Sequence, residues 1–83
     1  MSELLSKAET LRRFIAEITF IDIDKIKYET LLFEEGFFDS LGFLSLVSFL
    51  QDEFSIEIDG DDLSESNFES INTIAAFIET KIQ

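Results

Sequence analysis

The segment from Phe37 to Phe54, FFDSLGFLSLVSFLQDEF, limits the fold of this chain more than any other feature. After a polar break at Asp39 and Ser40, apolar residues cover most of the girth of a helix: Leu41, Phe43, Leu44, Leu46, Val47, Phe49, Leu50 and Phe54. A helix that is apolar on nearly all sides is buried among other elements. We therefore expect a helix from Ser40 to Phe54 at the centre of the fold, with Asp39 or Ser40 as its N-cap.

Two further helices are predicted from apolar residues spaced three and four apart. The first runs from Ser2 or Glu3 to Ile18, with Ser2 as a candidate cap. Its apolar stripe is Leu4, Leu5, Ala8, Leu11, Ile15 and Ile18, and its solvent side is Glu9, Arg12, Arg13 and Glu17. The last runs from about Ile71 to Ile82 after a cap at Ser70, with the stripe Ile71, Ile74, Ala75, Ile78 and Ile82.

The segment between the first two helices, Thr19 to Phe38, is predicted to be a long loop. Its apolar residues alternate with charged ones, which also fits a strand, but the chain offers no second strand of similar quality. We expect Phe20, Ile21, Ile23 and Ile26 to pin the loop to the core, with a helical turn near Ile23 to Ile26 and a turn at Gly36. A loop this long in a small domain is often functional.

After the second helix, the sequence predicts a turn at Asp59 to Asp62 and a short helical turn from a cap at Ser64 to Asn67. The fold class is therefore all-α: a small bundle of three main helices plus one short helix, in a single domain over residues 1–83. The acidic residues Asp59, Asp61, Asp62 and Glu65 do not have EF-hand spacing, so we expect a solvated turn and no metal site.

Composition excludes most enzyme classes. The chain has no histidine and no cysteine, which removes the commonest general base, the commonest metal ligand and every thiolate site. The first residues contain both charge signs and no apolar block of the kind found in signal peptides, so we expect a cytoplasmic protein. No apolar run is long enough to predict a membrane span.

The net charge is −12, and the charges are unevenly distributed along the chain. No lysine or arginine occurs between Tyr28 and Thr80, where thirteen acidic residues fall. Such a surface repels nucleic acid and anionic membranes and attracts basic protein surfaces. The charge also helps to keep a small domain monomeric, and we expect a monomer.

Asp39-Ser40 is the candidate functional site. A serine at the start of a helix is most often only a cap. This serine, however, follows a long loop and begins the most apolar helix, where free backbone N–H groups and the helix dipole favour an attached phosphate. Both interpretations stay open on these residues alone.

The run GFFDSLGFLSLVSFLQDEFSIEI resembles the acyl carrier protein family, and the similarity extends over most of the chain. It includes an amphipathic first helix, a long loop, a D-S-L motif that begins the second helix, an aromatic-I-x-I exit, a short acidic helix and a final helix. The resemblance implies that Ser40 receives 4′-phosphopantetheine from coenzyme A, with Asp39 and Leu41 as its motif neighbours. The terminal thiol of that arm would carry acyl or aminoacyl groups as thioesters.

The chain departs from this pattern at two places. Many members have glycine two residues before the aspartate, whereas Gly36 lies three before Asp39. Fatty-acid carriers have acidic residues along the second helix, whereas this chain has Gly42, Ser45, Ser48 and Gln51 there, and acids only at Asp52 and Glu53. The resemblance therefore implies a specialised stand-alone carrier for a secondary-metabolite or aminoacyl pathway, not one of housekeeping fatty-acid synthesis.

The partners implied by the resemblance are a phosphopantetheinyl transferase, a ligase that loads an acyl or aminoacyl group, and a downstream transferase or synthase with basic docking surfaces. The predicted partner face is Phe37, Phe38, Phe43, Leu44, Phe49, Asp52 and Glu53, and we expect about half of its aromatic rings to be in the core. We expect no catalytic residues. The alternative function is an unmodified acidic interaction module that docks a basic partner through the second helix.

Overall fold

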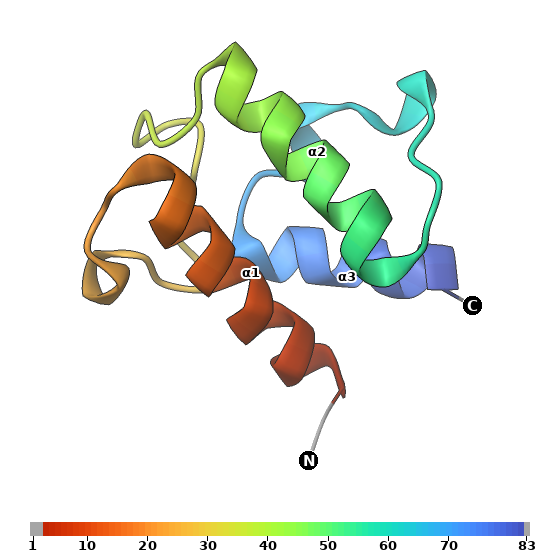
Figure 1. Ribbon diagram of the computed structural model, residues 1–83, viewed down its shortest axis with the longest axis horizontal. Helices are drawn as coiled ribbons and strands as arrows, with labels where there is room; N and C mark the ends of the chain where they lie inside the picture. The colour runs from red at the N-terminus through yellow and green to blue at the C-terminus, as the bar shows by residue number, and fades with distance from the viewer. Residues whose placement is uncertain (1–2, 83) are drawn as a thin grey trace.

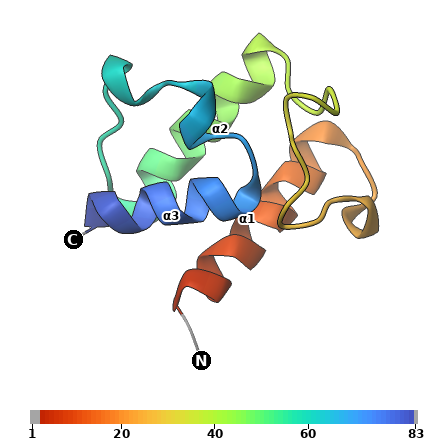
Figure 2. The ribbon, with the colours of Figure 1, turned by 180° about the vertical axis from the view of Figure 1, so that it is seen from behind.

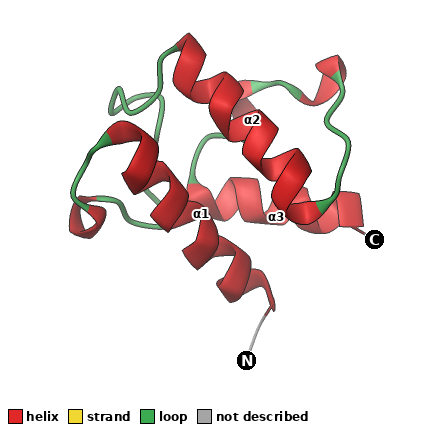
Figure 3. Ribbon diagram, viewed as in Figure 1, coloured by secondary structure: helices red, strands yellow, loops and turns green. Residues whose placement is uncertain are grey.

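The computed structural model describes residues 3–82, and the side chains of residues 6–82. It contains three α-helices, α1 (Glu3–Thr19), α2 (Ser40–Phe54) and α3 (Ile71–Ile82), and no strand in the part described (Figures 1 and 3). Three single 3-10 turns, η1 (Ile23–Lys25), η2 (Gly60–Asp62) and η3 (Glu65–Asn67), lie in the connections. The predicted all-α fold is confirmed. The turn predicted at Asp59 to Asp62 forms η2, and the short helix predicted from Ser64 to Asn67 is the single 3-10 turn η3.

The helices form two levels. In Figure 1, α1 and α2 lie side by side and run in opposite directions, while α3 crosses behind both; Figure 2 shows α3 in front from the other side. The predicted helix bounds agree with the structure to within one residue. The proposed cap at Ser2 lies outside the described residues, as do the side chains of Leu4 and Leu5 in the predicted stripe.

The core is centred on α3, and the prediction of a central second helix is wrong. Five side chains of α3 are buried, against two of α2, Leu46 and Leu50. The buried apolar residues of the described chain are Ala8, Leu11, Ile15, Ile26, Leu32, Leu46, Leu50, Phe68, Ile71, Ile74, Ala75, Phe77 and Ile78. Because α3 lies behind α2 and α1 packs beside it, α2 is covered on those two sides and keeps an exposed apolar face.

The start of α3 is set by Ser70, as predicted. Its hydroxyl oxygen accepts a hydrogen bond from the Thr73 backbone N–H at 3.2 Å, and the residue is buried. Phe68, just before this cap, is fully buried and packs its ring at 5.4 Å from that of Phe77. The Ser70 cap and the buried Phe68 ring beside it together fix where α3 enters the core.

The long loop between α1 and α2 is held by polar contacts as well as by apolar ones. The Arg12 guanidinium donates from Nε to the Ile26 carbonyl at 2.6 Å and from Nη2 to the Ile23 carbonyl at 3.0 Å. Arg12 was predicted to face solvent; it is half-buried because these two loop carbonyls need donors. Ile26, as predicted, is fully buried.

Two further contacts connect this loop to helices on either side. The Tyr28 hydroxyl donates to Glu9 Oε1 at 2.6 Å, and this hydrogen bond lowers the pKa of Glu9 and raises that of Tyr28. The Asn72 N–H donates to the Tyr28 carbonyl at 3.0 Å, at the start of α3. The loop is therefore fixed to both α1 and α3 before it reaches α2.

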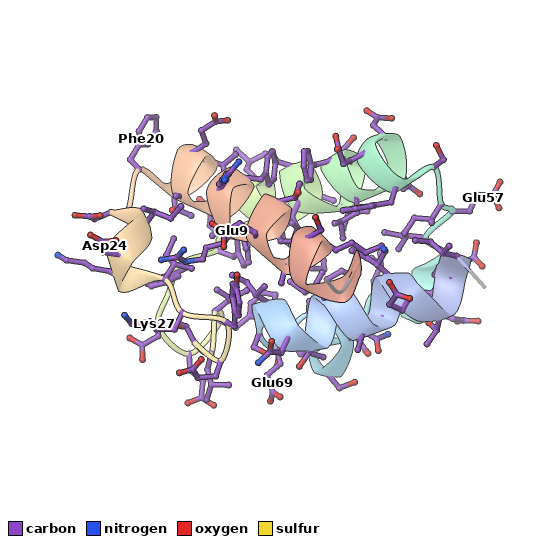
Figure 4. The ribbon with its side chains drawn as sticks, turned by 90° about the horizontal axis from the view of Figure 1, so that it is seen from below. Glu9, Phe20, Asp24, Lys27, Glu57 and Glu69 are labelled. Carbon is purple, nitrogen blue, oxygen red and sulfur yellow. The ribbon has the colours of Figure 1, made fainter. Side chains whose placement is uncertain are left out.

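The prediction that Phe20 pins the loop to the core is wrong, because 93% of this residue is exposed. Its φ of 59° lies in the left-handed region, where the chain turns sharply away from the end of α1. Glycine is the usual residue at such a position, since a side chain there is strained. Figure 4 shows the Phe20 ring extending away from the body of the molecule.

Replacing Arg12 tests how the loop is held. Arg12→Ala leaves two carbonyls without their charged donor, and we expect it to lower the free energy of unfolding by about 2–3 kcal/mol. Arg12→Lys should recover only part of this, because one ammonium group does not reproduce the planar fork of a guanidinium. Urea denaturation followed by circular dichroism measures the change. Arg13→Ala is the control, because that side chain is 75% exposed; an equal loss from both alanine variants would contradict the assignment.

Candidate functional site

Asp39 starts α2 and is its N-cap, which resolves the choice between Asp39 and Ser40. Its backbone is extended, with φ −102° and ψ −172°, and its Oδ1 accepts a hydrogen bond from the Gly42 N–H at 2.8 Å. Its carbonyl accepts the first helical bond from the Phe43 N–H at 2.9 Å. Asp39 therefore fixes Ser40 as the first residue of the helix.

Gly42 allows this cap to fit closely. A Cβ atom on Gly42 would lie 3.2 Å from Asp39 Oδ1 and 3.4 Å from Cδ1 of Phe38. The first distance is tight for a carbon atom against a carboxylate oxygen that already accepts a hydrogen bond, so a side chain would press on the cap. In the sequence Gly42 is only a neutral position of the second helix, and its packing against the cap carries no signal there.

Ser40 is exposed, and its hydroxyl makes no hydrogen bond within residues 3–82. The hydroxyl is therefore accessible from solvent. The N–H groups of Ser40 and Leu41 belong to the first turn, where a helix has no internal acceptors for them. An anionic group on Ser40 Oγ would lie beside these donors and at the positive end of the helix dipole. Ser40 and its neighbours thus fit an attached phosphate.

One face of α2 beyond Ser40 is open to solvent. Leu41 is 75% exposed and Leu44 is 58% exposed, while Ser45, Ser48 and Asp52 continue the same face at helical spacing. Glu53 is exposed beside it. We call Leu41, Leu44, Ser45, Ser48 and Asp52 the open face of α2. It is aliphatic next to Ser40 and acidic only at its far end.

Gln51 does not belong to this face, although it is one of the four neutral residues predicted to lie there. Its Oε1 accepts a hydrogen bond from the Ile58 N–H at 2.9 Å, so the side chain supports the chain after α2. Of the four neutral positions singled out in the sequence, only Ser45 and Ser48 lie on the open face.

The aromatic residues of the predicted partner face are half-buried: Phe37, Phe38, Phe43 and Phe49. All four pack against the core. The Phe49 ring stacks on that of Phe14, with centroids 3.9 Å apart, and the Phe43 ring meets that of Phe68 edge to face at 5.1 Å. We expected about half of these rings in the core, whereas all four are partly buried and pack against it. The most exposed apolar side chains beside Ser40 are therefore leucines.

A hollow of about 290 Å³ lies between the end of α1 and the start of α2. Its lining residues are Ile18, Thr19, Ile21, Gly36, Phe37, Phe38, Asp39 and Gly42. Gly36 has the positive φ of 76° that a sharp turn requires, as predicted from its position. The hollow therefore reaches the two residues, Asp39 and Gly42, that lie on either side of the Ser40–Leu41 pair.

The acidic turn after α2 has a structural role. Asp62 Oδ2 pairs with Lys81 Nζ of α3 at 2.6 Å and accepts a hydrogen bond from the Asp59 N–H at 3.0 Å. The hydrogen bond from Lys81, followed by that from Asp59, lowers the pKa of Asp62.

In the part of the chain described, no three acidic side chains are grouped as metal ligands, and no helix is long and apolar enough to cross a membrane.

Asp39→Ala tests the cap. We expect it to lower the free energy of unfolding by about 1 kcal/mol and to speed hydrogen exchange at the Gly42 amide, because that N–H loses its acceptor. Asp39→Asn should restore most of the stability, since asparagine caps about as well as aspartate. Hydrogen-exchange NMR checks both variants. Unchanged protection of Gly42 in Asp39→Ala would show that the cap does not hold this turn.

Comparison with known proteins gives one family. The sequence matches the PP-binding family, described as the phosphopantetheine attachment site, over residues 9–79. No curated protein matches the chain significantly. The matched span runs from within α1 to near the end of α3 and contains the D-S-L motif at the start of α2. The chain therefore belongs to the phosphopantetheine-binding family of carrier domains, and its cofactor is 4′-phosphopantetheine.

Proposed function

We propose that Ser40 is the attachment residue and that the chain carries acyl or aminoacyl intermediates of a specialised biosynthetic pathway. One observation carries the assignment: the Ser40 hydroxyl is exposed, has no partner within the described residues, and begins a helix capped by Asp39. The arm's terminal thiol forms the thioester, which a chain without cysteine needs from outside.

The residues around Ser40 have supporting roles in this proposal. Asp39 fixes the helix start, so the serine is presented in one geometry to each enzyme. The free first-turn N–H groups stabilise the phosphate once it is attached. Leu41, exposed beside the serine, is available to the phosphopantetheinyl transferase. We propose no catalytic group in the chain; the advantage of the arm is a high effective concentration of its cargo at each partner's active site.

The open face of α2 supports a specialised pathway. Next to Ser40 this face offers Leu41 and Leu44. Its carboxylate, Asp52, lies about 18 Å from Ser40 along the helix axis, at 1.5 Å per residue. A loading ligase or downstream synthase that fits this face needs an apolar pocket near its active site and basic residues farther away. Such docking depends on salt less than docking along an acidic helix does.

The alternative function is an unmodified acidic module that docks a basic partner through α2. The net charge of −12 and the exposed carboxylates Asp52 and Glu53 support it. The two functions differ in one requirement, because only the carrier needs the Ser40 hydroxyl. Partner binding that survives Ser40→Ala, in a chain that no transferase modifies, favours the module.

Intact mass spectrometry tests the attachment. With a phosphopantetheinyl transferase and coenzyme A, we expect the chain to gain the mass of one phosphopantetheine. Ser40→Ala should abolish the gain, because it removes the only atom that the arm is proposed to join. Ser45→Ala is the matched control, an exposed serine on the same helix, and should be modified normally. A full mass gain by Ser40→Ala would overturn the assignment.

Leu44→Ala tests the docking surface. Burial of a leucine side chain in an interface contributes about 1.5–3 kcal/mol, so we expect kcat/KM for loading by the cognate ligase to fall about tenfold. Ser48→Ala, on the same face, should change it less than about twofold. Steady-state kinetics at low and high salt give the comparison. If Asp52→Asn has the large effect and Leu44→Ala has none, docking is electrostatic and the proposed apolar contact is wrong.

A further inference from the structure

Phe20 is the most exposed large apolar residue in the part of the chain described. It is 93% exposed, against 75% for Leu41. The turn after α1 is held without its ring, because the Thr19 hydroxyl accepts a hydrogen bond from the Ile21 N–H at 3.3 Å and donates to the Ile15 carbonyl at 2.6 Å. The Phe20 ring is therefore available to a second molecule.

The backbone makes a side chain costly at this position. The φ of 59° lies in the left-handed region, where any residue with a Cβ atom is strained. Ser55 has a φ of 53° directly after α2, so a small polar residue is sufficient at a helix end of this kind. Strained backbone conformations that are kept despite their cost are concentrated at functional sites. The strain at Phe20, together with its exposure, indicates a role outside the fold.

The end of α1, where Phe20 lies, is next to the start of α2. The residues on either side of Phe20, Thr19 and Ile21, line the same hollow as Asp39 and Gly42. Phe20 itself is not part of this lining. An enzyme that surrounds the start of α2 therefore also meets the turn at the end of α1.

The Phe20 ring and Leu41 face the same broad side of the molecule. Figure 4 shows the ring projecting on the side of α1 and α2 that is turned away from α3. Leu41 precedes the fully buried Leu50 by nine residues, which at about 100° per residue places it on the opposite side of α2, away from the core. One partner surface can therefore contact both exposed side chains.

The charges around Phe20 favour a basic partner. Exposed carboxylates lie close to it in the chain on either side, at Glu17 and Asp22, while the nearest basic residues, Arg13 and Lys25, are farther away. An apolar ring between carboxylates fits a protein surface with an apolar pocket bordered by lysine or arginine. A second copy of this chain, also with a net charge of −12, would be repelled.

The chemistry at Ser40 indicates which basic partner this is. In the transfer from coenzyme A, a bond forms between Ser40 Oγ and the phosphorus that carries the pantetheine. The bond from that phosphorus to the bridging oxygen of the pyrophosphate breaks, adenosine 3′,5′-bisphosphate leaves, and a base of the transferase takes the serine proton. The transferase must therefore bring its active site to Ser40 itself, whereas an enzyme that acts on the thioester needs only to reach the end of the arm. An enzyme that binds the anionic coenzyme A also needs basic residues around its active site.

We propose that Phe20 is an anchor for the phosphopantetheinyl transferase, with its ring in an apolar pocket of that enzyme while Leu41 contacts the same surface beside Ser40. This inference rests on the proposed attachment at Ser40. It gives the strained turn after α1 a purpose, because the left-handed backbone directs the ring away from the core and toward the partner.

The kinetics of modification test the anchor. With coenzyme A and the phosphopantetheinyl transferase of the same organism, intact mass spectrometry follows the conversion of the wild-type chain and its variants. Phe20→Gly removes the ring, and we expect the KM for the carrier to rise about tenfold with kcat little changed, because the ring contributes binding and no chemistry. The urea midpoint of this variant should stay equal or rise, since glycine adopts a positive φ without strain. A lower midpoint with an unchanged KM would show that the ring serves the fold, which contradicts the proposal.

Two further variants separate the ring from the backbone. Phe20→Ala removes the ring but keeps the strained conformation, and it should raise the KM as much as Phe20→Gly does. Ile82→Ala, at a 50% exposed apolar residue of α3, is the control and should leave the KM unchanged. An unchanged KM in both Phe20 variants overturns the anchor and leaves the attachment intact, even where the same variants slow loading by the ligase.

The remaining outcomes are also decisive. A wild-type chain that is not modified at Ser40 overturns both the attachment and the anchor. Sedimentation analysis checks for self-association through the ring. A wild-type dimer that Phe20→Gly converts to a monomer, with an unchanged rate of modification, would assign the ring to a second copy of the chain and overturn the proposal.

Discussion

The guanidinium group of Arg12 is the contact on which the position of Ser40 most depends. Twenty residues separate α1 from α2, and only three of them form a turn of helix. Such a segment has a large conformational entropy, so an unanchored loop would leave the start of α2 poorly fixed. Arg12 ties its first part to α1 through the carbonyls of Ile23 and Ile26. Because the donor is charged and partly shielded from water, this contact is stronger than an ordinary hydrogen bond.

The remaining anchors act in sequence along the same loop. Tyr28 reaches back to Glu9 of α1 and forward to the start of α3, and Leu32 is buried while its N–H donates to the Glu69 carbonyl. By the time the chain reaches Asp39, it has been fixed to both other helices. The cap then needs to determine only the first turn of α2, and a single carboxylate hydrogen bond is sufficient for that.

The bounds of the three helices, with Ser40 as the first residue of the second, could be predicted from the sequence, because apolar spacing and capping residues are local signals. The arrangement of the helices could not. Since α2 and α3 are both rich in apolar residues, composition does not show that α3 lies behind both other helices and is the more buried. The role of Arg12 in holding the loop could not be predicted either, because its acceptors are backbone carbonyls 11 and 14 residues away. Phe20 was misassigned because hydrophobicity suggests burial, whereas a left-handed turn decides its direction.

The same geometry gives α2 two different sides. Successive residues of a helix are about 100° apart, so Gly42, which lines the hollow, points roughly opposite to Leu44 on the open face. By the same rule Ser40 is about 200° from Gly42, so it lies on the side of Leu44 and not on the side of the hollow. The exposed serine at the start of α2 and the exposed leucines of the open face can therefore be reached from one direction.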